Sequence, residues 1–154
     1  MADQATKAVQ PSTQTRGSTA AGPLLDVRGL QAAFFARRGT VRAVQDVSFA
    51  LNASRTLGIV GESGSGKSAT ALAVMRSLPF PGRILDGQVF FQGEDLRLKS
   101  EAEMQRFRGR SMALIPQDPT ASLNPLMKIG DHMLELLSTH LGLRGRAARG
   151  RAIE

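Results

Sequence analysis

The sequence predicts an α/β fold, on three observations. A short apolar run at residues 57–60 (LGIV) is typical of a buried, parallel strand, and a glycine-rich loop follows it at residues 61–66. Apolar residues then recur at helical spacing over residues 67–78. Apolar and polar residues alternate over residues 41–51, which indicates a half-buried strand. An antiparallel β portion is therefore expected beside the strand–loop–helix unit.

Shorter patterns predict the remaining elements. The helix at 67–78 should end at Pro79 and Pro81, because proline cannot continue it. Ser100 and Glu103 form a capping box, which predicts a short helix after Ser100. Further strands are expected at residues 24–35, 87–91 and 112–115, turns at residues 36–40 and 92–94, and helices at residues 131–141 and 146–154.

Composition narrows the class of protein. The absence of cysteine excludes disulfides and thiolate metal sites. The formal net charge is +7, but the one dense arginine cluster, at residues 144–151, has no aromatic residues for base stacking, so nucleic-acid binding is not expected. No apolar run approaches the roughly 18 residues that a membrane helix needs. Residues 1–23 are rich in Gln, Ser, Thr, Ala and Gly and are predicted to be a disordered tail, which leaves residues 24–154 as the domain.

The glycine-rich loop matches the pattern G-x-x-x-x-G-K-[ST] through Gly61, Gly66, Lys67 and Ser68. Its glycines let the backbone wrap closely around phosphate, with N–H groups turned inward, and the helix behind it adds its positive end. The Lys67 ammonium can reach β- and γ-phosphates, and the Ser68 hydroxyl can ligate Mg²⁺. The predicted phosphate-binding residues are Gly61, Glu62, Ser63, Gly64, Ser65, Gly66, Lys67, Ser68 and Ala69.

A second stretch, IPQDPTASLNP at residues 115–125, narrows the kind of nucleotide site. A guanine-reading N-K-x-D motif is absent, because Asn52 is followed by Ala and Asn124 by Pro. Gln117 follows the apolar run at 112–115, and a glutamine can ligate Mg²⁺ through its carbonyl and orient a water through its amide. A plain Asp-Pro and Asn-Pro turn is the alternative. The position downstream of a phosphate-binding loop favours the Mg²⁺ ligand.

These two motifs together resemble the ATP-binding subunits of ABC transporters. The resemblance is closer to the branch that imports dipeptides, oligopeptides, glutathione or nickel, in which the loop after the Q-loop glutamine commonly has the pattern D-P-x-x-S-L-N-P, as residues 118–125 do. It covers about residues 24–154. It implies a P-loop core of the ABC ATPase type with an antiparallel β portion, ending at the start of the helical subdomain near Ile129.

The resemblance also implies roles for particular residues. Residues 61–68 would be the Walker A loop for ATP and Mg²⁺, with Lys67 acting on the phosphates and Ser68 as a metal ligand. Gln117 would be the Q-loop glutamine, which senses Mg²⁺ and the γ-phosphate and links to the membrane partner. Phe34 would stack on adenine, with Phe35 as its rival.

The same resemblance implies partners and a location. The partners would be transmembrane permease subunits, a second ATPase subunit that is identical or related, and indirectly a solute-binding protein. The location would be the cytoplasmic face of the membrane, peripherally attached.

Parts that the family needs for turnover are missing from the sequence. There is no L-S-G-G-Q-like signature, and no apolar run ends in Asp-Glu as a Walker B strand would. His132 and His140 precede the expected signature position, so neither can be the switch histidine. The expectation is therefore a truncated chain that binds Mg·ATP weakly and does not hydrolyse it. A non-transport ABC ATPase and a binding-only module are the alternative functions.

Overall fold

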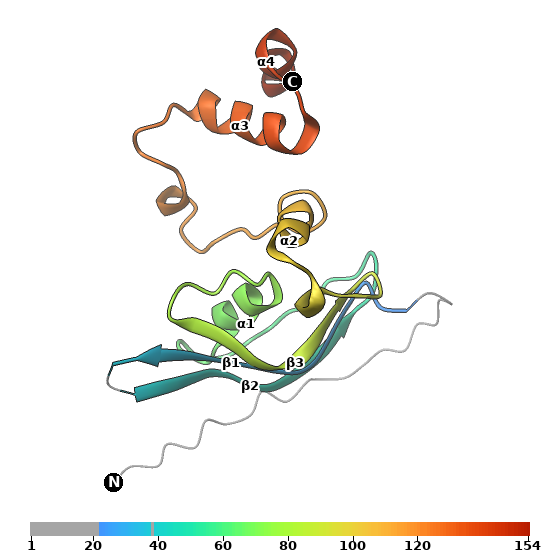
Figure 1. The fold of residues 1–154 in the computed structure, drawn as a ribbon, viewed down its shortest axis with the longest axis vertical. Coiled ribbons are helices and arrows are strands. Elements are labelled where there is room, and N and C mark those ends of the chain that lie inside the picture. The colour runs from blue at the N-terminus through green and yellow to red at the C-terminus, as the bar shows by residue number, and fades with distance from the viewer. Residues whose placement is uncertain (1–21, 38) are drawn as a thin grey trace. The chain divides into compact units, whose positions relative to one another are not determined.

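The computed structural model of the protein describes residues 22–37 and 39–154. Most of the tail predicted at residues 1–23 lies outside the described residues. The chain divides into two compact units, at residues 1–100 and 101–154, and each is described by itself. Figure 1 shows the sheet of the first unit and the helices of the second unit.

The first unit is built on a four-stranded antiparallel sheet with the strand order β2-β1-β3-β4. The alternating pattern predicted β2 correctly, and the strands predicted at 24–35 and 87–91 are present, although β3 begins earlier, at Gly82. The hairpin turn predicted at residues 92–94 joins β3 to β4. The strands are β1 (Leu25–Ala36), β2 (Gly39–Leu51), β3 (Gly82–Phe91) and β4 (Glu94–Asp95).

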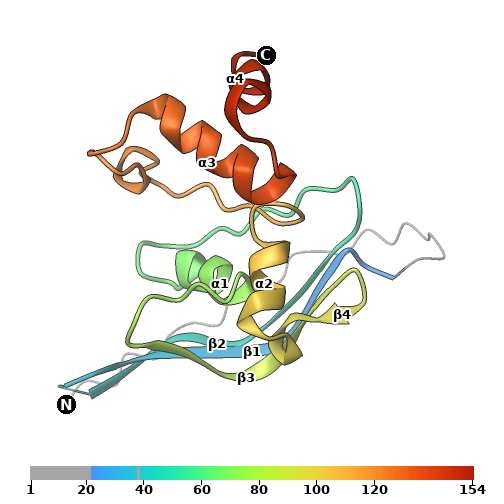
Figure 2. The same ribbon diagram turned by 45° about the horizontal axis from the view of Figure 1, so that its top comes forward.

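The core of this unit lies between the sheet and helix α1 (Lys67–Val74), which contacts β1, β2 and β3. Val27 and Leu30 of β1 and Val89 of β3 are fully buried, and the register irregularity between Val27 and Leu30 allows these two residues, three positions apart, to be buried together. Ala73 and Val74 of α1 are buried as well. Figure 2 shows α1 lying across one face of the sheet.

Helix α1 is shorter than the 67–78 helix that the spacing predicts, since it ends at Val74. Arg76 has a left-handed backbone, with φ of 49°, and the Ser77 N–H donates to the Leu72 carbonyl, 2.8 Å away. The Arg76 guanidinium donates to the carbonyls of Leu96 and Lys99, at and just after the short 3₁₀ helix η1 (Leu96–Leu98). Helix α1 thus ends four residues before the spacing predicts, beside a left-handed residue whose side chain binds the η1 segment.

The strand predicted at residues 57–60 is wrong. These residues form neither a strand nor a helix, and the exposed fractions are 41% for Leu57, 42% for Ile59 and 86% for Val60. A strand needs a neighbour for its backbone hydrogen bonds. In the part of the chain that the structure describes, the sheet of order β2-β1-β3-β4 does not include residues 57–60, so their apolar side chains remain at the surface.

The second unit is helical, with α2 (Glu101–Phe107), the 3₁₀ helix η2 (Thr120–Ser122), α3 (Ile129–Leu141) and α4 (Gly145–Ile153). The helices predicted after Ser100, at 131–141 and at 146–154 are all present. The strand predicted at 112–115 is wrong, because the backbone there makes one isolated bridge, between Arg108 and Met112, and Ile115 is 87% exposed. As at residues 57–60, an apolar run without a pairing neighbour does not become a strand.

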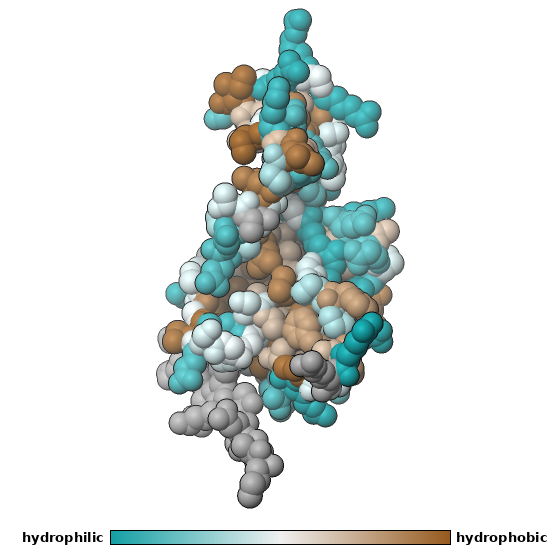
Figure 3. Space-filling model, turned by 90° about the vertical axis from the view of Figure 1, so that its left-hand side faces the viewer, coloured by the Kyte–Doolittle hydropathy of each residue, from teal (hydrophilic) through white to brown (hydrophobic). Residues whose placement is uncertain are grey.

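Large apolar side chains reach the surface in both units, as Figure 3 shows on one face. In α3 they recur at Ile129, Met133 and Leu136, which is the spacing of one helix face. Among residues 22–37 and 39–154, no helix combines the length and the apolar character needed to cross a bilayer.

Candidate phosphate-binding site

Lys67, the first residue of α1, closes the glycine-rich loop on itself. Its ammonium donates hydrogen bonds to the carbonyl oxygens of Gly61 and Glu62, each at 2.7 Å, and lies 3.4 Å from the Ser65 hydroxyl. The Ser65 N–H in turn donates to the Glu62 carbonyl, at 3.2 Å. The loop therefore forms a compact turn around a positive charge.

Two glycines of the loop adopt left-handed backbones, Gly64 with φ of 81° and Gly66 with φ of 92°. Gly66 is the N-cap of α1. A Cβ atom on Gly66 would lie less than 3.0 Å from the Ala43 carbonyl oxygen of β2, so this position excludes side chains for two separate reasons. Space as well as backbone angle requires glycine here.

Ala43 lies close to Gly66 because β2 has a bulge there. Val44 pairs with Ala32 and Arg42 pairs with Ala33, which leaves Ala43 as an extra residue without a partner in β1. A bulge locally disrupts the ladder and bends its strand. Here it brings a carbonyl of β2 against the first turn of α1.

The start of α1 is open to an anion. In the described part of the chain, the N–H groups of Gly66, Lys67 and Ser68 have no hydrogen-bond partner, as expected for the first turn of a helix. The helix dipole adds partial positive charge at this end. The Ser68 side chain is exposed, while Ser65 and Lys67 are half-buried. The geometry thus combines N–H donors, an ammonium and a free hydroxyl at one helix terminus, which suits a phosphate group.

Phe34 and Phe35, the rival adenine-stacking residues, have different surroundings at the end of β1. Phe34 is half-buried and packs so closely on Gly82 of β3 that a Cβ there would lie 2.7 Å from its ring. Phe35 is 44% exposed, and the Arg83 guanidinium lies 6.0 Å from its ring centre. The assignment of Phe34 as the stacking residue stays a prediction.

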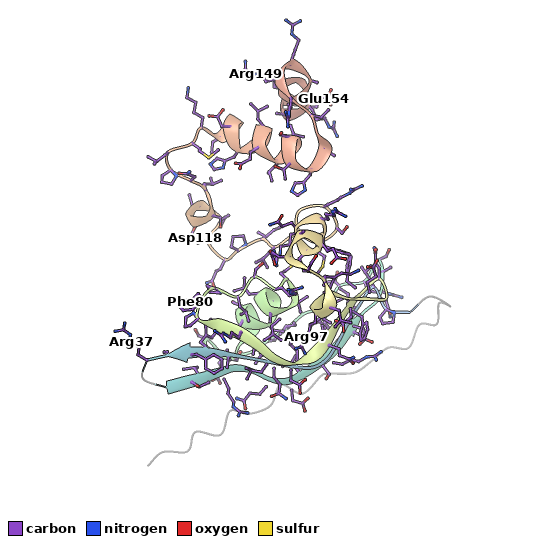
Figure 4. The ribbon with its side chains drawn as sticks, in the orientation of Figure 1. Arg37, Phe80, Arg97, Asp118, Arg149 and Glu154 are labelled. Atoms are coloured by element: carbon purple, nitrogen blue, oxygen red, sulfur yellow. The ribbon has the colours of Figure 1, made fainter. Side chains whose placement is uncertain are left out.

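Gln117 belongs to the second unit, in the exposed connection between α2 and α3. The residues after it form two side-chain-capped turns: the Asp118 carboxylate accepts from the Thr120 N–H, and the Asn124 side-chain oxygen accepts from the Leu126 N–H, both at 3.0 Å. Figure 4 labels Asp118 at the start of this stretch. The Asp-Pro and Asn-Pro turn chemistry is therefore present at residues 118–126, beside the role predicted for Gln117.

Comparison with known sequences identifies the family. The family described as ABC transporter matches residues 44–152, which include both the glycine-rich loop and Gln117. The chain belongs to the ABC transporter family. The glycine-rich loop and the Gln117 stretch are also the two motifs on which the resemblance noted in the sequence rests.

Relatives of this ABC transporter chain include the oligopeptide transport ATP-binding proteins OppD of Bacillus subtilis and Haemophilus influenzae. The identity is 46% and 45% over 132 residues, covering 85% and 86% of this chain. The matched part is 37% and 41% of those relatives, so the chain spans about two fifths of their length.

The fold of a solved bacterial ABC transporter cassette, the dimeric MJ0796, matches with a TM-score of 0.67. The match covers 84% of this chain and 54% of the cassette, at 18% sequence identity. A second structure of MJ0796, bound to ADP and phosphate, gives a TM-score of 0.66. The α/β fold of the ABC ATPase type is therefore confirmed.

The motif in this ABC transporter chain did not reveal every residue that shapes the loop. The Thr70 hydroxyl donates to the Gly66 carbonyl at 2.9 Å, and Thr70 is buried. The spacing of four residues on a helix could have suggested this bond. No signal in the sequence pointed to the bulge at Ala43, because alternation over residues 41–51 predicts a regular strand.

Proposed function

We propose that the chain binds the triphosphate of ATP together with Mg²⁺, as the N-terminal part of an ATPase subunit that powers import of peptides or a similar small solute. The observation that supports the proposal best is the Lys67 ammonium. It lies inside the loop, on the Gly61 and Glu62 carbonyls, next to the unpartnered N–H groups of the first turn of α1. The oxygens of a nucleotide's phosphate chain can engage all of these donors together.

The proposal assigns a task to each of the donor groups and side chains. The N–H groups of Gly66, Lys67 and Ser68 donate to phosphate oxygens, and the Lys67 ammonium neutralises charge on the β- and γ-phosphates. The exposed Ser68 hydroxyl supplies a hard oxygen ligand to Mg²⁺, whose other ligands would be phosphate oxygens, water and the Gln117 side chain. Phe34 holds adenine by stacking. Mg²⁺ would supply charge stabilisation to the phosphates.

The names of the relatives support the proposed solute class, and the proposed partners are those that the sequence resemblance implies. Two proteins 45–46% identical to this chain are oligopeptide transport ATP-binding proteins, which supports a peptide or a similar small solute as cargo. We accordingly place residues 24–154 as the front part of an ATP-binding domain. It would work with a permease, a second ATPase subunit and, indirectly, a solute-binding protein, at the cytoplasmic face of a membrane. Hydrolysis is assigned to the longer protein, because the signature and Walker B motifs are not in these residues.

The experiment is a titration of the chain with a fluorescent ATP analogue and Mg²⁺, comparing Lys67→Ala with Lys128→Ala. Loss of charge-assisted hydrogen bonds should weaken binding about 10- to 100-fold in Lys67→Ala. Lys128, an exposed lysine before α3, is the matched control and should leave affinity unchanged. Equal affinity of the wild type and Lys67→Ala would overturn the proposal. Steady-state hydrolysis by this chain that disappears in Lys67→Ala would overturn the assignment of turnover to the longer protein.

A further inference from the structure

Helix α3 holds the stretch that follows Gln117 through a histidine side chain. The His132 Nε2 atom lies 3.3 Å from the Asn124 carbonyl oxygen. A carbonyl can only accept, so a hydrogen bond here requires the tautomer with the proton on Nε2. Nothing in the predicted role of Gln117 requires this contact, and the phosphate-binding proposal does not use His132.

The His132 bond joins the turn at residues 119–127 to helix α3. Residues 119–127 are tied by short-range bonds such as Ser122 N–H to the Pro119 carbonyl and Met127 N–H to the Asn124 carbonyl, at 3.2 and 3.0 Å. His132 is eight residues away from Asn124 and belongs to the first turn of α3. Its bond therefore connects the turn to helix α3, whereas the short-range bonds lie within the turn.

The Asn124 backbone is the junction of this arrangement. Its carbonyl accepts from both the Met127 N–H and His132 Nε2, and its side-chain oxygen accepts from the Leu126 N–H. Of these three bonds, the one from His132 is the bond that comes from α3. Asn124 lies seven residues after Gln117, and both residues are exposed.

We propose that His132 is a positioning residue, which fixes the far end of the Gln117 stretch to helix α3 through its bond to the Asn124 carbonyl. His132 thereby limits where the Gln117 side chain can lie when a nucleotide is bound. This consequence rests on the proposed function, but the contact itself does not. The chain offers a built-in comparison, because its second histidine, His140, lies on the same helix and contacts Gly109 instead.

The test is amide hydrogen exchange by NMR on the whole chain without nucleotide. His132→Ala should raise the exchange rates of the Leu126 and Met127 amides about three- to tenfold, while amides in the middle of α3 keep their rates. His132→Gln should restore the slow rates, since the glutamine amide can donate over a similar reach. His140→Ala should leave residues 118–127 unchanged. The imidazole nitrogen signals of His132 should report a proton on Nε2.

Three results would overturn the proposal: unchanged exchange in His132→Ala, no rescue by His132→Gln, or an equal rise throughout α3, which would mark a role in helix stability only. A repeat with Mg·ATP then tests the consequence. The signals of the Gln117 side-chain amide should shift on addition in the wild type and shift less in His132→Ala. If nucleotide does not bind at all, the proposed function fails while the exchange data still decide the role of His132.

Discussion

Replacing Gly66 by alanine tests the loop geometry most directly. Gly66 has φ of 92° and caps α1, and a Cβ atom there would lie less than 3.0 Å from the Ala43 carbonyl oxygen. That oxygen belongs to the backbone of β2, so it cannot rotate away as a side chain could. The start of α1 and the bulge of β2 must therefore move apart.

The size of the effect follows from this overlap. Relieving it requires a shift on the order of 1 Å to restore an ordinary contact. The left-handed backbone adds about 1–2 kcal/mol for any residue with a Cβ atom. A shift of this size misaligns the N–H groups of Gly66 and Lys67, and losing one hydrogen bond to a charged group costs about 1.5–3 kcal/mol. Gly66→Ala should thus weaken Mg·ATP binding about 10- to 100-fold.

Gly64→Ala is the matched control. Gly64 has a similar backbone, with φ of 81°, but a Cβ atom there would meet nothing within 4 Å. Both variants bear the left-handed strain, and Gly66→Ala alone bears the overlap with Ala43. In a fluorescent ATP titration, Gly64→Ala should lose less than about tenfold in affinity. Equal dissociation constants for the two variants would refute the reasoning that overlap with the Ala43 carbonyl displaces the loop and weakens binding.

The other predictions use pairs of residues in different surroundings. Phe34→Leu should weaken Mg·ATP binding about three- to tenfold through lost stacking, and Phe35→Leu should not; the opposite result in the same titration would assign adenine stacking to Phe35. Val89→Ala, at a position 1% exposed, should lower the free energy of unfolding by about 2 kcal/mol. Val60→Ala, at a position 86% exposed, should change it by less than about 0.5 kcal/mol, and a large loss in denaturant unfolding would mean that residue 60 is buried in solution. Gly109→Ala should displace His140, whose Nε2 would lie 2.5 Å from the new Cβ atom, and the added loss of stability should shrink in a His140→Ala background; a double-mutant cycle without coupling would contradict the contact.

Local patterns were enough to predict most of the regular elements. The helices of the second unit and the strands β1 and β2 were predicted close to their observed bounds, because capping residues, helical spacing and two-residue alternation are properties of neighbouring residues. The loop at residues 61–68 was predicted for the same reason. Its glycines and its lysine act over a few residues, and the Lys67 bonds to Gly61 and Glu62 span six and five positions.

The errors arose where structure depends on distant residues. The runs at 57–60 and 112–115 have strand-like composition, but a strand also needs a partner, and composition cannot report whether one is present. Helix α1 ends early beside Arg76, which has a left-handed backbone and whose guanidinium donates to carbonyls 20 and 23 positions away. The local sequence indicates neither whether a pairing strand is present nor which distant carbonyls Arg76 will bind.

The bulge at Ala43 changes the explanation of the motif itself. From the sequence, Gly66 is a glycine because the backbone must turn and approach phosphate closely. The structure adds a second requirement, since the unpaired residue of β2 places its carbonyl where a side chain on Gly66 would be. The left-handed backbone and the Ala43 carbonyl both require glycine at all times, whereas the close approach to phosphate would matter only in the complex. The antiparallel β portion therefore constrains the glycine-rich loop, because the Ala43 carbonyl of β2 lies against Gly66.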